Sequence, residues 1–429
     1  MNQRLSFPGP AGRRTTPVRH ILWIILAACC ATAARGDENW PEFRGPRGDG
    51  SSDAVGLPLR WGENENVKWK TPIHDRGWSS PVVWGNQVWM TTATADGKRL
   101  YAVCVARDSG KIVHDILVFD DHKPEWIHSL NSYASPTPVV EAGRVYVHFG
   151  TYGTACLDSA SGQEIWTRRD LHCNHFRGPG SSPALVDNLL FLHFDGFDVQ
   201  YVVALDKQSG KTAWKVDRST DFAAADGDLR KAFSTPLVIG PSGQQQLISA
   251  GSRAAMAYDP QTGKELWKVN YPIGFSTTSR PLLAAGMVVV STGSGRSELW
   301  ALRPDGRGDV TKSHVAWKVA KAMPFKTSPT LADGLLFTVN DGGIATCIEA
   351  RSGEIVWQQR LDGQYSASPL AAEGRVYFFS HEGKTTVIEA GRTYKELAVN
   401  TLPGGFMASP AVSGKALFLR TTTHLYRIE

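Results

Sequence analysis

Two histidines and a cysteine lie close together in the sequence and raise the question of metal chemistry. His172, Cys173 and His175 fall within four residues, and Asp195 and Asp198 follow in the next repeated unit. Imidazole nitrogens and thiolates are zinc ligands, but this spacing matches no standard zinc pattern. The sequence therefore predicts no metal site, and these histidines are expected to form ordinary hydrogen bonds.

Aromatic and basic side chains form a second set of candidates, because they recur just before the apolar segments of the chain. An aromatic ring with a nearby cation can hold an anionic or sugar-like ligand, or a peptide segment. An equally open interpretation is that the rings fill the centre of the fold and that the cations are solvated. The candidates for binding a ligand or partner are His74, Arg76, Trp78, His128, Tyr133, His172, His175, Arg177, Arg230, Phe233, Arg280, Lys326 and Tyr365.

A repeat of fixed spacing must position these candidates. Four segments follow the pattern Asp/Glu-x3-Gly-x3-Trp, at residues 158–166, 206–214, 259–267 and 349–357. Each copy predicts a hairpin: a strand, a tight turn whose glycine supplies a positive φ, and a strand that carries the tryptophan. An internal period of this kind is typical of repeat architectures.

A second marker, a proline that leads into an apolar strand, recurs through the chain. The eight prolines are Pro81, Pro138, Pro183, Pro236, Pro281, Pro329, Pro369 and Pro410, which predict eight units. The last strand, residues 425–428, lacks a tryptophan strand after it, and residues 67–70 can supply one. The predicted fold is therefore all-β: an eight-bladed β-propeller of four-stranded antiparallel blades, closed by pairing of the N- and C-terminal strands.

The tryptophans are expected to hold the blades together, each packing from an outer strand against the neighbouring blade. Burial of such a side chain stabilises by about 1.5–3 kcal/mol. Blades one and seven carry His114 and Leu397 at the expected position, and blade five reaches its tryptophan after an insertion at residues 305–314. The predicted docking residues are Trp69, Trp166, Trp214, Trp267, Trp317 and Trp357.

Three cysteines share one position in the repeats. Cys104, Cys156 and Cys347 each lie six residues before the turn glycine, where other repeats place alanine. Buried thiols behave as small hydrophobic groups. We therefore expect these cysteines in a small-residue slot of the core rather than in disulfides.

The start of the chain reads as an export signal. Arginines precede an apolar run at residues 21–28, and small residues follow it. Cys29 could instead be the lipidated residue of a lipobox. The predicted organisation is a signal peptide at 1–35, an N-terminal extension at 36–60 and the propeller at 61–429, in a monomer located in the periplasm or cell envelope.

The charge of the exported part excludes some partners. Five of the 46 basic residues lie in residues 1–35, which leaves 41 against 41 acidic residues. A net charge near zero removes the global attraction on which nucleic acid or an anionic membrane surface depends. No nucleic acid partner is expected, and a membrane contact is expected only through a lipid anchor.

The repeats resemble those of the PQQ-like (pyrroloquinoline-quinone) repeat family, in the quinoprotein alcohol dehydrogenase-like superfamily. Ala204, Asp206, Gly210 and Trp214 match its Ala-x-Asp-x3-Gly-x3-Trp docking motif, as do residues 257–267, and residues 39–46 resemble the start of its soluble bacterial members. One branch of the family holds PQQ and Ca²⁺ on the axis, under a disulfide of adjacent cysteines. Another branch, typified by an outer-membrane assembly lipoprotein, binds partner proteins and has no cofactor.

These features favour an exported, non-catalytic propeller that binds an envelope protein or a small polar ligand at its aromatic and basic face. No adjacent cysteines follow residue 35, and no Ca²⁺ ligand set can be assembled, so no cofactor is expected. The alternative is a PQQ-dependent periplasmic dehydrogenase of alcohols or sugars, with Ca²⁺ polarising the quinone and a carboxylate taking the alcohol proton. Its carboxylate candidates are Asp195, Asp198, Asp226 and Asp228.

Overall fold

The computed structural model describes residues 1–9, 12, 39–120, 122–223 and 225–429. The chain divides into two units, Met1–Ala34 and Arg35–Glu429. Cys29 and most of the predicted signal peptide lie outside the described residues. Within the described ranges, no helix has the length and apolar character needed to cross a bilayer.

The second unit contains eight sheets, each with four antiparallel main strands, which confirms the predicted fold class. Each blade starts with a short strand that directly follows a marker proline and ends with an outer strand. Two short 3-10 helices, η1 (Gly150–Tyr152) and η2 (Gly227–Arg230), lie in loops between strands.

The first four blades follow the chain in order. Their strands are β3 (Val82–Trp84), β4 (Gln87–Ala93), β5 (Leu100–Ala106) and β6 (Ile112–Phe119); β7 (Val139–Glu141), β8 (Arg144–His148), β9 (Thr154–Asp158) and β10 (Glu164–Arg168); β11 (Ala184–Val186), β12 (Leu189–Asp195), β13 (Gln200–Asp206) and β14 (Thr212–Asp217); β15 (Leu237–Ile239), β16 (Gln246–Ala250), β17 (Ala254–Tyr258) and β18 (Glu265–Asn270).

The other four blades include strands from both ends of the chain. They contain β19 (Leu282–Ala284), β20 (Met287–Ser291), β21 (Leu299–Leu302) and β23 (Val315–Val319); β24 (Thr330–Ala332), β25 (Leu335–Val339), β26 (Ile344–Glu349) and β27 (Ile355–Arg360); β28 (Leu370–Ala372), β29 (Arg375–Phe379), β30 (Lys384–Glu389) and β31 (Glu396–Thr401); β32 (Ala411–Ser413), β33 (Ala416–Arg420), β34 (His424–Ile428) and β2 (Val67–Pro72).

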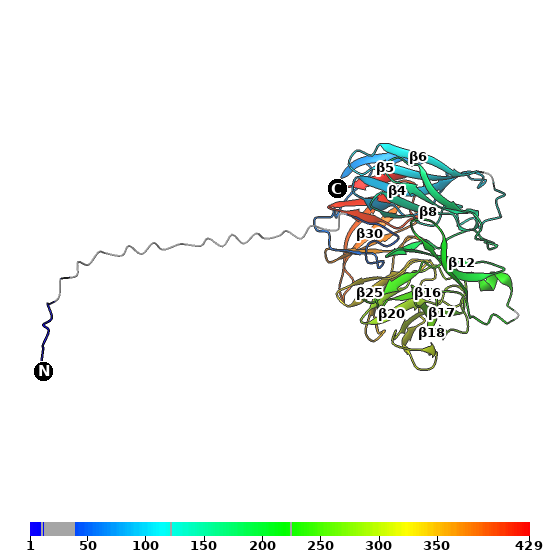
Figure 1. The fold of residues 1–429 in the computed structure, drawn as a ribbon. Helices are drawn as coiled ribbons and strands as arrows, with labels where there is room; N and C mark the ends of the chain where they lie inside the picture. The colour runs from blue at the N-terminus through cyan, green and yellow to red at the C-terminus, as the bar shows by residue number, and fades with distance from the viewer. Residues whose placement is uncertain (10–11, 13–38, 121, 224) are drawn as a thin grey trace. The chain divides into compact units, whose positions relative to one another are not determined.

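The two ends of the chain close the ring as predicted. Strand β2 pairs antiparallel with β34, from Val67 opposite Ile428 to Pro72 opposite His424. The red C-terminal strands therefore lie beside the blue strands of the first blade in Figure 1. This pairing completes blade eight and leaves no open end in the ring of blades.

Tryptophans of the repeated hairpins lie over the turn glycine of the next blade. A Cβ atom at Gly210 would come within 2.7 Å of the Trp166 ring, and one at Gly263 within 2.6 Å of the Trp214 ring. The indole N–H also donates to a carbonyl of that next turn. These bonds join Trp69 to Arg107, Trp166 to Lys207, Trp214 to Pro260, Trp317 to Ala350 and Trp357 to Gly391, at 2.9–3.1 Å.

Blade four departs from this pattern because the insertion in blade five replaces the usual turn. The indole of Trp267 is fully buried and donates to Gln246 Oε1 at 2.8 Å. Strand β22 (Gly308–Asp309), which comes from the insertion, pairs parallel with Trp267 and Lys268. The insertion thus adds a fifth strand beside the tryptophan.

Blade seven corrects one prediction. Ala398, not Leu397, occupies the tryptophan position, since it lies opposite Val387 as Trp166 lies opposite Cys156. The turn between β30 and β31 is one residue longer than the regular hairpin turns, such as that between β26 and β27, which shifts the register. Trp61 of the N-terminal segment fills the space and stacks on Tyr377, with ring centroids 6.2 Å apart.

The cysteine prediction is confirmed. The four cysteines that the structure describes are buried and free. Cys104, Cys156 and Cys347 lie opposite the docking positions of their blades, His114, Trp166 and Trp357.

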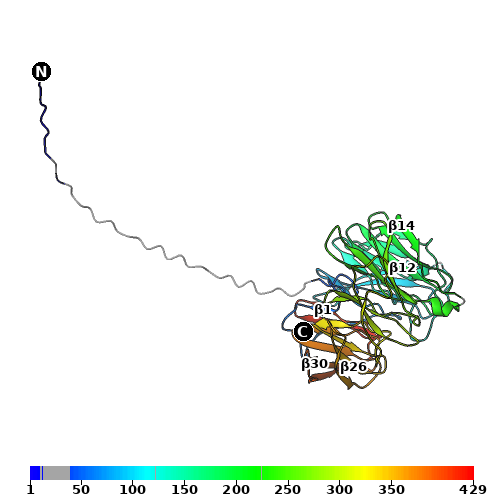
Figure 2. The same ribbon diagram turned by 90° about the horizontal axis from the view of Figure 1, so that it is seen from below.

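The N-terminal segment crosses one face of the propeller. The backbone of Trp40 bridges to Val83 in blade one. Strand β1 (Ser51–Ser52), labelled in Figure 2, then pairs parallel with β28 in blade seven, which is separated from blade one only by blade eight. Residues 40–52 therefore bring side chains to the axis from this face.

Candidate functional site

A ring of hydroxyl groups surrounds the axis. The residue before each marker proline is serine or threonine in seven of the eight blades. Its backbone N–H donates to the hydroxyl oxygen of the equivalent residue in the next blade, at 2.9–3.1 Å. The donors are Ser80, Thr137, Ser182, Arg280, Ser328, Ser368 and Ser409. This ring links the inner ends of the blades.

Arg280 stands where blade five lacks the hydroxyl. Its buried guanidinium donates to the carbonyls of Pro236 and Phe43 and forms an ion pair with Glu42 at 2.9 Å. Burial raises the pKa of the Glu42 carboxyl, although the Arg280 charge opposes this shift. Arg280 thus holds the N-terminal segment and does not line the binding mouth, where the sequence placed it.

Arg44 completes this closure from the N-terminal side. Its buried guanidinium donates to the carbonyls of Pro329 and Pro369, in blades six and seven. Burial lowers the pKa of Arg44 to about 9. Glu42 and Arg44 therefore close one end of the axis through polar contacts with blades five, six and seven.

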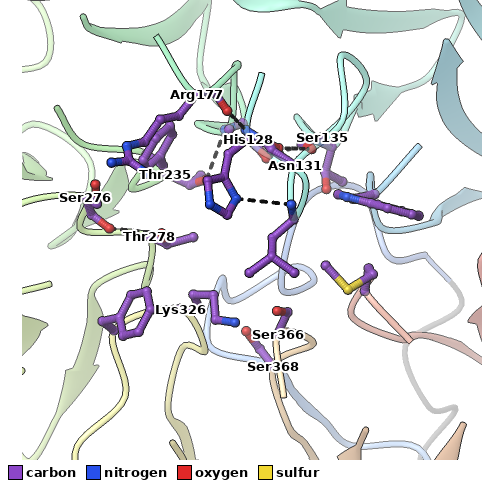
Figure 3. Close-up of a pocket in the computed structure, with 18 of the residues that line it drawn as sticks. His128, Asn131, Ser135, Arg177, Thr235, Ser276, Thr278, Lys326, Ser366 and Ser368 are labelled. Atoms are coloured by element: carbon purple, nitrogen blue, oxygen red, sulfur yellow. Dashed lines mark hydrogen bonds between the residues drawn. The ribbon is translucent and has the colours of Figure 1, made fainter. Parts of the chain in front are cut away.

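The other end of the axis opens into a pocket of about 430 Å³ (Figure 3), a size typical of ligand sites. Phe43 reaches it from the closed side, and ring hydroxyls contribute to its lining. Its lining residues include Phe43, Trp78, Ser80, His128, Leu130, Asn131, Ser135, Thr137, Arg177, Ser182, Asp228, Phe233, Thr235, Phe275, Ser276, Thr278, Phe325, Lys326, Ser366, Ser368, Met407 and Ser409.

The structure brings five of the predicted binding residues together in this pocket. They are Trp78, His128, Arg177, Phe233 and Lys326, contributed by five different blade entries. Arg177 binds Asp228 through two hydrogen bonds of 2.6 Å. Lys326 lies 3.0 Å from Asp341, and burial lowers the pKa of its ammonium to about 8.

The other predicted residues have partners outside the pocket. His74 bonds Asp75 and Asp115, Arg76 donates to the carbonyl of Ser129, and Arg230 donates to that of Ala225. The hydroxyls of Tyr133 and Tyr365 donate to the carbonyls of Glu125 and Asp362. Local sequence could not distinguish these side chains from the five that line the pocket.

His172, Cys173 and His175 do not form a metal site with the aspartates. Cys173 and His175 are buried and contact each other at 3.5 Å, whereas His172 is exposed near Thr151. Among the residues that the structure describes, no group of three histidine, cysteine, aspartate or glutamate side chains is placed to hold a metal ion.

The carboxylates do not fit the Ca²⁺ site that a quinone cofactor of this fold would use. Asp228 lines the pocket, but Arg177 occupies both of its oxygens. Asp195 is buried against Arg218, Asp198 accepts backbone N–H groups, and Asp226 caps η2. Ca²⁺ takes six to eight oxygen ligands, carboxylates prominent among them, and these groups already have other partners.

The hydroxyl groups and Phe43 were missed by the sequence analysis as pocket residues. A signal was present, because the Ser/Thr-Pro steps mark the start of every blade but one. They were interpreted only as fold markers. The single arginine among them was the sign of a special contact on the axis.

Comparison with known proteins gives consistent matches. A family model described as "Outer membrane protein assembly factor BamB" matches residues 69–239 and 306–393. The BamB of Yersinia pestis is 24% identical over 203 residues, which cover 44% of this chain and 49% of that protein. The BamB of Shewanella oneidensis is 26% identical over 250 residues, 53% of this chain and 57% of that protein. The matched part thus spans about half the length of these relatives.

Solved structures share the fold at low identity. BamB from Moraxella catarrhalis has a TM-score of 0.59 at 11% identity, covering 84% of this chain and 99% of that one. A europium-containing methanol dehydrogenase has a TM-score of 0.66 at 11% identity, covering 90% of each chain. At 11% identity, both likenesses show a shared fold and nothing more.

Proposed function

The chain belongs to the family described as outer membrane protein assembly factor BamB, built of PQQ-like repeats, and we propose that it is an exported, non-catalytic scaffold that binds an envelope protein. The binding face is the one that carries the axial pocket. The proposal includes export to the periplasm or cell envelope.

An aromatic row beside the pocket carries this proposal. The side chain of Trp126 is 58% exposed, and its ring contacts that of Phe176 in a tilted arrangement with centroids 5.3 Å apart; Phe176 in turn contacts Phe197 edge to face, also at 5.3 Å. Leu130 is 49% exposed and also lines the pocket. Contiguous exposed apolar side chains mark protein interaction sites more often than solitary ones do.

The loops that carry this row are held firmly to one another. The carbonyl of Arg177 accepts hydrogen bonds from His128 N and Asn131 Nδ2. Phe197 N donates to the carbonyl of Asn174 at 2.7 Å. A row whose backbone is fixed in this way loses little conformational freedom when a partner binds.

Capture of a partner from envelope extracts tests the proposal. The double variant Trp126→Ala/Phe176→Ala should capture the partner of the native protein at least about tenfold less well, because buried aromatic anchors dominate interface energies. Leu117→Ala is the matched control, since Leu117 is 43% exposed on the outer strand β6, away from the pocket. Equal capture by native protein and the double variant would refute this binding face.

The proposal includes no bound cofactor, since Arg177 occupies the carboxylate that lines the pocket. Titration with PQQ and Ca²⁺, followed by absorbance, should give no saturable binding. Saturable binding together with dye reduction in the presence of alcohols or aldoses would favour a dehydrogenase instead.

A further inference from the structure

One corner of the pocket combines a lysine with two serine hydroxyls from neighbouring blades. Lys326 precedes β24 in blade six, and Ser366 and Ser368 precede β28 in blade seven. Figure 3 shows the ammonium of Lys326 directed toward these two serines. The corner exists only because the blades lie side by side, since 40 residues separate Lys326 from Ser366 in the sequence.

The Lys326 ammonium has hydrogen-bonding capacity to spare. Its side chain is 17% exposed and its Nζ atom lies 3.0 Å from Asp341 Oδ1. An ammonium carries three donors, and this one contact uses at most one of them. The burial that lowers the pKa of Lys326 to about 8 also means that an additional anion would stabilise its charged form.

The two serines add donors or acceptors at the same place. The Ser368 oxygen accepts the N–H of Ser328 at 2.9 Å, and its own proton has no acceptor within the described part of the chain. The Ser366 oxygen lies 2.8 Å from His381 Nε2. A ligand that offers acceptors to Lys326 and Ser368 would satisfy both groups.

Arg177, on another side of the pocket, differs from Lys326 because its charge is already paired through two hydrogen bonds. Two bonds of 2.6 Å to Asp228 use both carboxylate oxygens and two guanidinium nitrogens. That cation is already neutralised in the geometry that carboxylates prefer. An acidic ligand therefore gains more from Lys326 than from Arg177.

The walls around Lys326 favour a ligand that is apolar next to its charge. Phe275, Phe325, Met407 and Phe43 line the same pocket. Apolar walls weaken screening by water and so strengthen an ion pair formed inside. Trp126 of the aromatic row contacts His128, which lines the pocket, with ring centroids 6.3 Å apart, so a chain segment lying on that row can reach the pocket.

We infer that Lys326, with Ser366 and Ser368, binds the carboxylate of an aspartate or glutamate side chain, carried next to an aromatic or aliphatic residue in an extended segment of the partner protein. This rests on the proposed function, because it assigns a recognition chemistry to the same face.

Two short peptides test the inference without the partner. Isothermal titration of the full-length protein compares acetyl-Phe-Glu-Phe-amide with acetyl-Phe-Gln-Phe-amide, which differ only in the charge of the central residue. The native protein should bind the Glu peptide at least about tenfold more tightly. Equal affinities, or no binding of either peptide at millimolar concentration, would overturn the inference.

Variants of Lys326 test whether this residue causes the preference for the Glu peptide. Lys326→Met should reduce the preference for the Glu peptide to about onefold, whereas Lys264→Met, in an exposed turn of blade four, should keep it. Because Lys326→Met leaves Asp341 without its cation, the double variant Lys326→Met/Asp341→Asn provides a neutral pair and should lose the preference equally. A preference that survives in both variants would contradict the assignment.

The pH dependence gives an independent readout. Among the described residues, Asp341 forms an ion pair with Lys326 and His381 feels its charge; the pKa of His381 is lowered, mainly by burial, which keeps its imidazole neutral above pH 7. The preference for the Glu peptide should therefore fall as the pH rises from 7 to 9, through the pKa of Lys326 at about 8. A preference that is constant over this range would argue against Lys326.

Two further measurements separate this inference from a site for small carboxylates and from the proposed function itself. If acetate bound as tightly as the Glu peptide, the corner would be a site for small carboxylates and the peptide segment would be wrong. If Lys326→Met captured the envelope partner as well as the native protein while Trp126→Ala/Phe176→Ala did not, this inference would fail and the proposed function would stand.

Discussion

The perimeter and the axis of this propeller are built on opposite principles. At the perimeter the same contact recurs, with an indole over the turn glycine of the next blade, as for Trp166 over Gly210 and Trp214 over Gly263. At the axis seven of the eight blades share a hydroxyl before the marker proline, but the other side chains that line the pocket include aromatic, basic, acidic and aliphatic ones. Repetition stabilises the ring, and the departures from repetition create a distinctive surface.

Irregular blades show how the perimeter tolerates lost repeats. Blade seven has Ala398 in place of the tryptophan, and Trp61 of the N-terminal segment takes over its contact with Tyr377. Blade four keeps Trp267 but is covered by β22 of the insertion. In both cases another segment of the chain restores the missing packing, since an empty slot would leave a cavity between blades.

Truncation at the N-terminus should have the largest effect on the stability of the propeller. A chain beginning at Ile73 lacks β2, Trp61 and the residues that close the axis, so blade eight loses its outer strand. We expect no cooperative unfolding transition from this chain, measured by circular dichroism against a chain beginning at Asn39.

A chain beginning at Gly56 sharpens this test, because it retains Trp61 and β2 but loses Phe43 and Arg44. It should melt cooperatively at a lower temperature than the chain from Asn39. If it were as unfolded as the chain from Ile73, closure of the axis would matter as much as closure of the ring.

Removal of one buried indole should have the next largest effect. Trp267→Ala should lower the free energy of unfolding by about 3–5 kcal/mol, as large-to-small changes of buried aromatics do. Trp126→Ala, at an exposed position, should lower it by less than about 1 kcal/mol. Urea unfolding of both variants measures the difference, and similar losses would mean that Trp267 does not carry blade packing.

Acid should destabilise the inner part of the blades through buried histidines. Burial lowers the pKa of His148 to about 3 and that of His193 to about 4. Below pH 6.5 the unfolded chain takes up protons that the folded protein refuses, so stability present above pH 6.5 is lost as the pH falls toward 4. Each histidine contributes up to about 1.4 kcal/mol per pH unit.

Urea unfolding at pH 7 and pH 5 measures this loss. His193→Asn should diminish it, whereas His172→Asn, at an exposed position, should leave it unchanged. A loss of the same size in both variants would show that other groups cause the acid sensitivity.

A pair of glycine substitutions measures the smallest of the expected effects on stability, that of the close contact between glycine and tryptophan at the perimeter. Gly263 and Gly286 have nearly equal positive φ values, 73° and 76°, so alanine suffers the same backbone strain at both, about 1–2 kcal/mol. Only at Gly263 would the new Cβ meet a ring, that of Trp214, whereas Gly286 has open space. Gly263→Ala should therefore cost about 1–3 kcal/mol more, and equal melting temperatures would contradict the docking contact.

The amino-acid sequence by itself determined the fold, because each regular hairpin is encoded within about ten consecutive residues, and the glycine and tryptophan spacing is intact in four of the eight blades. The eight marker prolines predicted the number of blades, and the unpaired strands at the two ends of the chain predicted that the ring closes. One register was wrong, at Leu397, where a longer turn moved the docking position to Ala398.

Only the tertiary structure decided which side chains share the pocket. Lys326 and Phe233 face it, while Tyr365 and Arg280 look equivalent in the sequence but are buried in other contacts. The position of each side chain depends on the ring closure and on the N-terminal segment that brings Phe43 to the axis. A pocket assembled from the entry loops of many blades has no local sequence pattern, since its geometry arises from contacts between segments that are far apart in the chain.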